Sequence, residues 1–145
     1  MNRFSSLTLI LFLLAGVFNT PVTSTAGQPV LNQISEEIFQ NSRNDQMWQM
    51  QKSKRLKTAS SAEQYLNELN QGEYQDWRLP TKQELYKLFS YFDLKMHGNV
   101  RIRLEGNYWI QNKDIQAGAW DIGDQCGPSR TFYMKKAGDV RAIRP

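Results

Sequence analysis

The side chains best suited to nucleophilic catalysis are one cysteine and one histidine. Cys126 and His97 are the only residues of their types in the 145-residue sequence. A thiol nucleophile needs an imidazole within hydrogen-bonding reach, and Cys126 lies in a turn-like Cys-Gly-Pro-Ser run with no helix start behind it to activate the sulfur. His97 lies in another polar turn, between Lys95 and Asn99. We therefore expect a free thiol or an intermolecular disulfide at Cys126, and no enzyme.

The sequence offers little for a metal or a cofactor. One histidine and one cysteine cannot supply the usual four ligands of a zinc site. Asp121 and Asp124 flank Gly123, but their spacing is not that of a calcium-binding loop. No glycine-rich phosphate loop is present either. We expect no bound metal and no cofactor.

Charge is the more informative property. The chain has 18 Lys and Arg against 14 Asp and Glu, a net charge of +4, and the excess lies in the last third. A basic surface there would suit an anionic polymer, such as a sulfated or uronic-acid polysaccharide, or an envelope phosphate. The alternative is ordinary solubility charge. The candidate binding residues are Arg101, Arg103, Lys135 and Lys136.

A second basic stretch follows Met47-Trp48. It contains Lys52, Lys54, Arg55 and Lys57. Runs of charge usually mark solvated faces, so we interpret this stretch as a solvated loop or an edge strand.

The first 26 residues have the pattern of a secretory signal peptide. Arg3 precedes an apolar run over residues 7–18, and the small residues Ser24-Thr25-Ala26 follow a proline. The run is shorter than the roughly 20 apolar residues of a membrane span, although an uncleaved anchor remains the alternative. We expect an exported mature chain, residues 27–145, that is periplasmic or secreted, has no transmembrane span and binds no nucleic acid.

Two helices must position the candidate residues. Ser60 and Glu63 form the pattern of a capping box before a helix over residues 61–71, and Gly72 is a typical helix terminator. Thr81 and Glu84 repeat the pattern before an apolar stripe that runs from Leu85 to Phe92. A third, short helix is possible over residues 34–39.

The later part of the chain changes to the period of strands. Val100, Ile102 and Leu104 alternate with Arg101 and Arg103, which predicts a strand with both arginines on one face. Further short strands are predicted at Tyr108–Ile110, Ala119–Ile122, Thr131–Lys135 and Val140–Arg144. We expect the last two to form a hairpin closed by residues 136–139. Helices followed by strands predict an α+β protein with an antiparallel sheet.

Composition limits the class of protein. Hydrophobic residues make up 40% and aromatic residues 12% of the chain, which excludes intrinsic disorder. A single cysteine excludes a disulfide-stapled mini-protein. The length fits one domain, which we place at residues 45–145, after an N-terminal extension over residues 27–44.

One run of residues resembles a known family. Asp76-Trp77-Arg78-Leu79-Pro80-Thr81-Lys82-Gln83-Glu84-Leu85 is similar to the signature of the DUF1566 family, also called the Lcl C-terminal domain, of bacterial exported proteins. The other counterparts follow in the same order: Met47-Trp48, Gly72, Tyr108-Trp109, Ala119-Trp120 and the closing Val140–Arg144. The resemblance covers residues 45–145.

The resemblance implies a C-type lectin-like fold, related to that of formylglycine-generating enzymes, with two helices packed on a twisted antiparallel sheet with long loops. The catalytic thiols of those enzymes come as a pair, whereas this chain has one cysteine. The name-giving member's domain is associated with binding glycosaminoglycans. The motif residues are expected to be structural, with Arg78 and Arg141 pairing with carboxylates such as Glu84. They are Trp77, Arg78, Leu79, Pro80, Thr81, Glu84, Trp109, Trp120, Arg141 and Arg144.

Together these patterns predict an exported, non-catalytic binding domain for an anionic polysaccharide or for an envelope or extracellular partner. A structural accessory protein of the bacterial envelope is the first alternative. An enzyme that uses Cys126 is the second.

Overall fold

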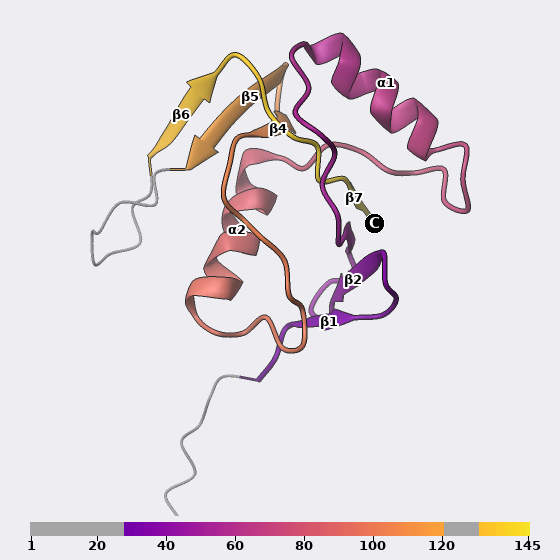
Figure 1. The fold of residues 1–145 in the computed structure, drawn as a ribbon. Coiled ribbons are helices and arrows are strands. Elements are labelled where there is room, and N and C mark those ends of the chain that lie inside the picture. The colour runs from indigo at the N-terminus through magenta and orange to yellow at the C-terminus, as the bar shows by residue number, and fades with distance from the viewer. Residues whose placement is uncertain (1–27, 121–130) are drawn as a thin grey trace, which may run out of the picture.

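The computed structural model describes residues 28–120 and 131–145 (Figure 1). Within these ranges the chain is α+β, with two helices and two antiparallel sheets. The helices are α1 (Ala59–Leu69) and α2 (Lys82–Asp93). The strands are β1 (Leu31–Gln33), β2 (Ile38–Asn41), β3 (Met47–Gln49), β4 (Tyr108–Gln111), β5 (Ile115–Trp120), β6 (Phe132–Lys135) and β7 (Ile143–Arg144).

The first sheet joins the two ends of the described chain. Its order is β1-β2-β3-β7, and the register places Trp48 opposite both Phe39 and Ile143. Phe39 and Trp48 stack with ring centroids 6.3 Å apart, as large aromatic side chains do across neighbouring strands. Residues 27–44, which we expected to precede the domain, thus supply β1 and β2 to this sheet.

The second sheet has β5 between β4 and β6. Gly118 of β5 allows this pairing, because a Cβ atom there would overlap the ring of Phe132 and lie 2.7 Å from the carbonyl oxygen of Tyr133. Of the strand predicted at Ala119–Ile122, residues 119 and 120 form the end of β5, which begins earlier than predicted, at Ile115. Residues 121 and 122 lie outside the described residues.

Helix α1 begins two residues before the predicted position. Thr58, and not Ser60, is the N-cap: its hydroxyl accepts a hydrogen bond from the Ser61 N–H at 3.1 Å, and the Ser61 hydroxyl accepts one from the Thr58 N–H at 3.2 Å. The earlier start packs Ala59 against the core. The helix ends at Asn70, whose side-chain amide exchanges two hydrogen bonds with the backbone of Trp77, so Gly72 is not needed in a left-handed conformation.

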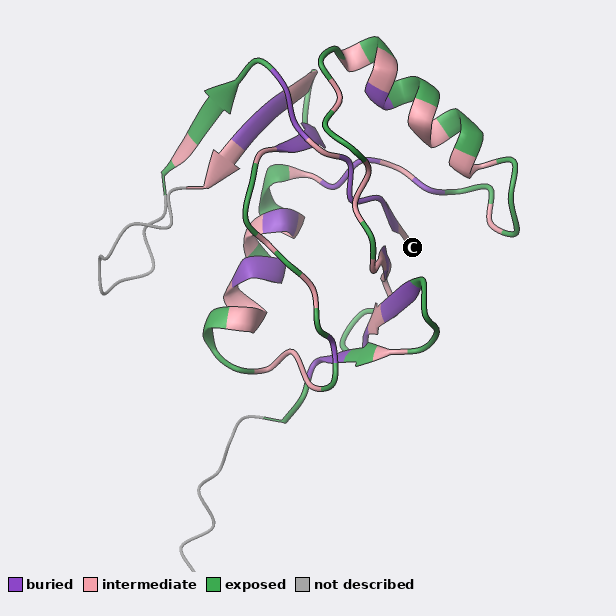
Figure 2. Cartoon of the chain, viewed as in Figure 1, coloured by how far each residue is buried: buried purple, intermediate pink, exposed green. Residues whose placement is uncertain are grey.

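Helix α2 begins as predicted. Thr81 is its N-cap, and the capping box with Glu84 is complete. Leu85, Leu88 and Phe89 form the buried side of the helix, which faces the interior between the two sheets (Figure 2).

Three predictions about elements were wrong. Residues 34–39 form no helix: the Ser35 hydroxyl accepts hydrogen bonds from the N–H groups of Glu37 and Ile38, which makes a turn that leads into β2. Serine hydroxyls commonly accept hydrogen bonds from nearby main-chain N–H groups in this way, which favours a turn over a helix.

Residues 100–104 form no strand, although Arg101 and Arg103 are exposed on one side as expected. Side chains occupy the carbonyls that a neighbouring strand would use. Arg141 donates to the Arg103 carbonyl at 3.0 Å, and the Tyr108 hydroxyl donates to the Leu104 carbonyl at 2.9 Å.

The predicted C-terminal hairpin is also absent. β6 pairs with β5 in the second sheet, and β7 pairs with β3 in the first. Residues 136–142 cross from one sheet to the other, and Gly138 forms an isolated antiparallel bridge with Leu56 on the way.

The buried side chains form three hydrophobic clusters. One lies under α1 around Trp77 and Trp109, one lies between the first sheet and α2 around Phe39 and Trp48, and one lies between α2 and the second sheet around Tyr108. No helix in the described part of the chain is long and apolar enough to cross a membrane. The predicted signal peptide, residues 1–26, lies outside the described residues.

Candidate functional site

The motif run forms a charged lock at the start of α2. Arg78 donates two parallel hydrogen bonds to Glu84, at 2.7 and 2.9 Å, which is the carboxylate pairing expected from the sequence. The Glu84 carboxylate also accepts from the Thr81 N–H at 2.8 Å. Such bidentate, charge-assisted pairs are stronger than neutral hydrogen bonds. The lock fixes the extended segment before α2 to the first turn of the helix.

Glu84 is also the link between α2 and the first sheet. Gln46, in the turn before β3, donates from its amide nitrogen to Glu84 at 2.9 Å, and Asn44 donates to the Gln46 amide oxygen at 2.7 Å. Burial alone would raise the pKa of Glu84, but the hydrogen bonds from Arg78 and Thr81 outweigh it and lower the pKa to about 2. The Glu84 carboxylate is therefore ionised, and it accepts hydrogen bonds from Arg78, Thr81 and Gln46.

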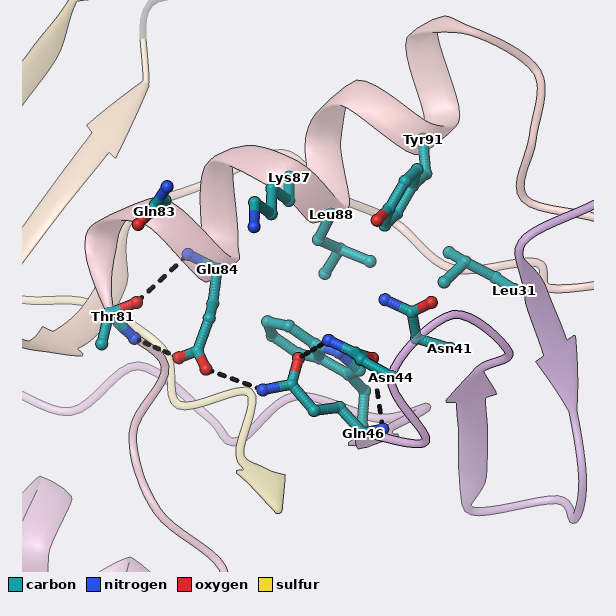
Figure 3. Close-up of a pocket in the computed structure, with 11 residues that line it drawn as sticks. Leu31, Asn41, Asn44, Gln46, Thr81, Gln83, Glu84, Lys87, Leu88 and Tyr91 are labelled. Atoms are coloured by element: carbon teal, nitrogen blue, oxygen red, sulfur yellow. Dashed lines mark hydrogen bonds between the residues drawn. The ribbon is translucent and has the colours of Figure 1, made fainter. Parts of the chain in front are cut away.

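A pocket of about 230 Å³ opens between this lock, the β2–β3 turn and the outer side of α2 (Figure 3). Leu31, Trp48 and Leu88 form its apolar floor, and all three are buried. The remaining lining residues are polar: Asn41, Asn44, Gln46, Thr81, Gln83, Glu84, Lys87 and Tyr91.

Arg141 is buried and binds main-chain carbonyls, not the carboxylate expected from the sequence. Its side chain is 1% exposed, and its guanidinium donates to the carbonyls of Gln49 at 2.7 Å, Met50 at 2.6 Å and Arg103 at 3.0 Å. The expected carboxylate partner is absent among the described ion pairs. Burial lowers the pKa of Arg141. Arg141 thereby connects the last residue of β3 and the residue after it with the segment before β4.

Arg144 of β7 binds the first residue of the motif run, Asp76. It donates two hydrogen bonds to Asp76, at 2.6 and 3.0 Å, and lies 4.0 Å from the ring centroid of Tyr74. The hydrogen bond from Arg144 lowers the pKa of Asp76. In addition, the backbones of Arg78 and Ile143 exchange two hydrogen bonds of 2.9 Å. The motif run is therefore fastened to β7.

The exposed cations gather elsewhere. Leu56 and Gly138 exchange backbone hydrogen bonds of 2.8 and 3.1 Å, so the segment before α1 runs antiparallel to the segment after β6 (Figure 1). The two paired segments carry five exposed cationic side chains that form no ion pair with any described residue. We call them the basic patch: Lys54, Arg55, Lys57, Lys135 and Lys136.

Lys52 is excluded from the basic patch because it has structural partners. Its ammonium lies 2.6 Å from Asp139 and donates to the Glu105 carbonyl at 2.8 Å. Lys52 neutralises Asp139, the one carboxylate of residues 135–139, so this carboxylate is not left to pair with the basic patch.

A comparison with family models identifies the chain. The model of the Lcl C-terminal domain matches residues 37–144, which is most of the sequence. The chain belongs to the Lcl C-terminal domain family. No curated protein and no solved structure matches it significantly. The matched range begins before residue 45 and includes β2, in agreement with the pairing of β2 in the first sheet.

The tryptophans of this Lcl C-terminal domain differ in environment. Trp77 and Trp109 are buried in one cluster, and the Trp109 indole donates to the Leu56 carbonyl at 3.2 Å. Trp120 is half-buried between Tyr86 and Phe132, with the Lys82 ammonium 5.4 Å from its ring centroid. Leu79 and Pro80 are buried, and the Pro80 carbonyl accepts from the Gln111 N–H at 3.0 Å.

The structure separates the four predicted ligand-binding residues of the domain. Lys135 and Lys136 belong to the basic patch. Arg101 and Arg103 lie on the segment between α2 and β4, and Arg101 donates to the carbonyls of Gly98 and Val100. No described contact joins the two pairs. Sequence reasoning missed the partners of Lys135 and Lys136, namely Lys54, Arg55 and Lys57, because nothing local signals the pairing of Leu56 with Gly138.

The described residues do not test the candidate pair of Cys126 and His97, which the sequence offers only as an alternative. His97 stacks on Phe92, with ring centroids 4.6 Å apart, and its Nδ1 lies 3.2 Å from the Val100 carbonyl oxygen. Cys126, Asp121 and Asp124 lie outside the described residues. Within the described part of the chain, no group of three or more metal-ligating side chains occurs.

Proposed function

We propose that this domain is a non-catalytic binding module that holds an anionic polymer on the basic patch. The observation that carries the proposal is the Leu56–Gly138 bridge, which pairs two distant segments with five exposed cations that form no ion pair with any described residue. Like charges repel, so their collection at one place lowers stability unless a ligand of opposite charge uses it.

The type of cation favours a polymer over a small ligand. Four of the five are lysines, whose ammonium groups are flexible, strongly hydrated point charges. One exposed ion pair contributes only about 0–1 kcal/mol. Several such contacts to one chain of repeated charges add up without the need for a shaped cavity. A sulfated or uronic-acid polysaccharide has this repetition, and the association of the name-giving family member with glycosaminoglycans agrees with it.

Export belongs to the same proposal. Residues 1–26 have the features of a signal peptide, and an extracellular or periplasmic site would bring the domain to such polymers. Mass spectrometry of the protein from the periplasm or medium tests it, because cleavage near Ala26 is expected. A full-length mass in the cytoplasmic fraction would contradict export.

We propose a C-type lectin-like arrangement for the fold. The support is the pair of helices beside antiparallel sheets, the long irregular segments and the closure of the first sheet by β7. An experimental structure that superposes on C-type lectin-like domains would bear this out.

Heparin-affinity chromatography tests the binding proposal. In the patch variant Lys57, Lys135 and Lys136 are replaced by Gln. In the control variant Lys82→Gln, Lys95→Asn and Lys113→Gln remove the same charge elsewhere, with Asn chosen because Lys95 has a φ of 56°. We expect the patch variant to elute at clearly lower salt than the control variant. Equal elution would reject the basic patch as the site.

A protein partner is the second candidate, and one observation favours it. Tyr133 and Met134 are exposed on β6, which is an edge strand of the second sheet as described. Exposed apolar side chains on an edge strand suit a protein neighbour. Pull-down from envelope extract with wild type and with Tyr133→Ser/Met134→Ser separates this reading from glycan binding, which those changes leave intact.

Activity through Cys126 is the remaining alternative. If any activity is found, Cys126→Ser decides the point: full activity in that variant rejects a thiol mechanism and supports the non-catalytic proposal.

A further inference from the structure

We propose that the pocket between the β2–β3 turn and α2 binds a small hydroxylated carboxylate, no larger than about one sugar ring. The pocket shares no residue with the basic patch, so this inference stands apart from the proposed function.

The first support is an amide that is buried but not fully used. Asn41 is 5% exposed, and its Oδ1 accepts a hydrogen bond from the Arg43 N–H at 3.0 Å. This bond fixes the orientation of the amide, so its NH₂ group faces the opposite way. Figure 3 shows the Asn41 amide directed toward the side chains of α2 that line the pocket. No hydrogen bond joins the NH₂ group to an acceptor among the described residues, so this donor is left for a ligand in the pocket. A ligand with an acceptor oxygen can bind it directly.

The second support is the balance of donors around the pocket. Lys87 extends from α2 beside Glu84 without an ion pair to any described residue, and Tyr91 directs its hydroxyl toward the same space (Figure 3). Arg43 lies over the ring of Tyr91, with its guanidinium carbon 5.9 Å from the ring centroid. The groups left free to bind are thus mainly donors and cations. Such a site selects a ligand with acceptor oxygens and negative charge.

Glu84 would oppose an anion if its charge were free. Its carboxylate, however, accepts two hydrogen bonds from Arg78, one from Thr81 and one from Gln46. The paired arginine compensates the charge, and the oxygens have little capacity left for a ligand. The charge that remains free to act on a ligand in the pocket is therefore the positive charge of Lys87.

The size of the pocket limits the ligand. A water molecule occupies about 30 Å³ of liquid, so 230 Å³ corresponds to roughly eight waters, and drug-sized pockets begin at about 300 Å³. The apolar floor of Leu31, Trp48 and Leu88 suits the C–H face of a ring or a short carbon chain. Gln83 and Asn44 at the rim can exchange hydrogen bonds with hydroxyl groups. These features indicate a sugar acid or a small hydroxy acid.

The test is an NMR titration of the purified full-length protein with sodium D-glucuronate, sodium L-lactate and D-glucose. We expect saturable shifts of the side-chain amide signal of Asn41 and the indole signal of Trp48 with glucuronate, and much weaker shifts with glucose. Saturable binding of lactate alone would also support the carboxylate site and set its upper size below a ring. Equal affinity for glucose and glucuronate, or no saturable shift with either carboxylate, would overturn the proposal.

Three variants assign the binding to the pocket. Asn41→Asp keeps the oxygen that accepts from Arg43 but replaces the NH₂ group with a second, negative oxygen, so we expect an affinity loss of at least about tenfold. Lys87→Gln removes the cation and should weaken binding about tenfold, whereas Lys113→Gln on the β4–β5 turn should not. If Asn41→Asp does not fold, as judged by its melting temperature, Lys87→Gln decides the outcome alone. Unchanged affinity in Lys87→Gln, or an equal loss in the patch variant, would contradict the assignment and leave the proposed function of the basic patch untouched.

Discussion

Leu56 and Gly138 exchange two backbone hydrogen bonds across 82 residues of sequence, and this contact places the segment that carries Lys57 next to the segment that carries Lys136. A Cβ atom at Gly138 would lie 3.0 Å from the Asn107 carbonyl oxygen. The contact therefore depends on a residue without a side chain.

Replacement of Gly138 should weaken both the fold and the basic patch. We expect Gly138→Ala to lower the free energy of unfolding by about 1–2 kcal/mol, because the new methyl group forces the backbone at residue 107 to move. Urea denaturation measures the loss. Gly72→Ala is the matched control, since Gly72 is exposed and has no left-handed φ. Equal stability of Gly138→Ala and wild type would contradict the packing described.

The Arg78–Glu84 lock should be worth more than an ordinary surface ion pair. Glu84→Gln keeps the shape but removes the charge from a carboxylate that accepts hydrogen bonds from Arg78, Thr81 and Gln46. We expect a loss of about 1–3 kcal/mol in urea denaturation. A double-mutant cycle with Arg78→Gln should give a coupling energy above the roughly 0–1 kcal/mol of exposed pairs. Additive effects of the two changes would mean that the pair contributes little.

Acid should unfold the protein partly through the same residue. The pKa of Glu84 falls from 4.5 to about 2 on folding. Between these two values the unfolded chain binds more protons than the folded chain, so stability is complete above pH 4.5 and falls as the pH decreases toward 2. Glu84→Gln should flatten this part of the profile of unfolding free energy against pH. A profile of unchanged slope in the variant would assign the acid sensitivity to other carboxylates, such as Asp76.

Arg141 should be among the most sensitive positions of the chain. Arg141→Met fills a similar volume but leaves the carbonyls of Gln49, Met50 and Arg103 without their donor. Each buried group left unsatisfied costs about 1–3 kcal/mol, so we expect a loss of about 3 kcal/mol or more, seen as a large fall in melting temperature. Arg103→Gln, an exposed change on the same contact, should leave the melting temperature nearly unchanged. A stable Arg141→Met protein would show that water replaces the guanidinium.

What the sequence could predict was local. The capping box of α2 was found because Thr81 and Glu84 are three residues apart and each satisfies the other's backbone. The same rule misplaced the start of α1, because Ser60 with Glu63 fits it, whereas the true capping box has Ser61 where the rule expects Glu or Gln. The hydrogen bonds between Thr58 and Ser61 and the packing of Ala59 favour the earlier start.

The remaining features depend on contacts between distant segments. Arg141 was expected to meet a carboxylate, but the fold presents it with carbonyls of three residues that lie far away in the sequence. The pocket draws Asn41 from β2 and Lys87 from α2, and the basic patch draws lysines from both sides of the Leu56–Gly138 bridge. Composition located excess charge in the last third of the chain, but it could not show which charges meet.

The most direct test of the central claim is the affinity of a defined heparin oligosaccharide for wild type and for the Lys57, Lys135 and Lys136 to Gln variant across a salt series. The domain should bind more weakly as salt rises, because ion contacts release bound counterions and are screened. We predict that the variant loses at least about tenfold in affinity at low salt and has a shallower dependence on salt, whereas the variant at Lys82, Lys95 and Lys113 keeps most of both. Identical affinity and identical salt dependence in wild type and the patch variant would contradict the assignment of anionic-polymer binding to the basic patch.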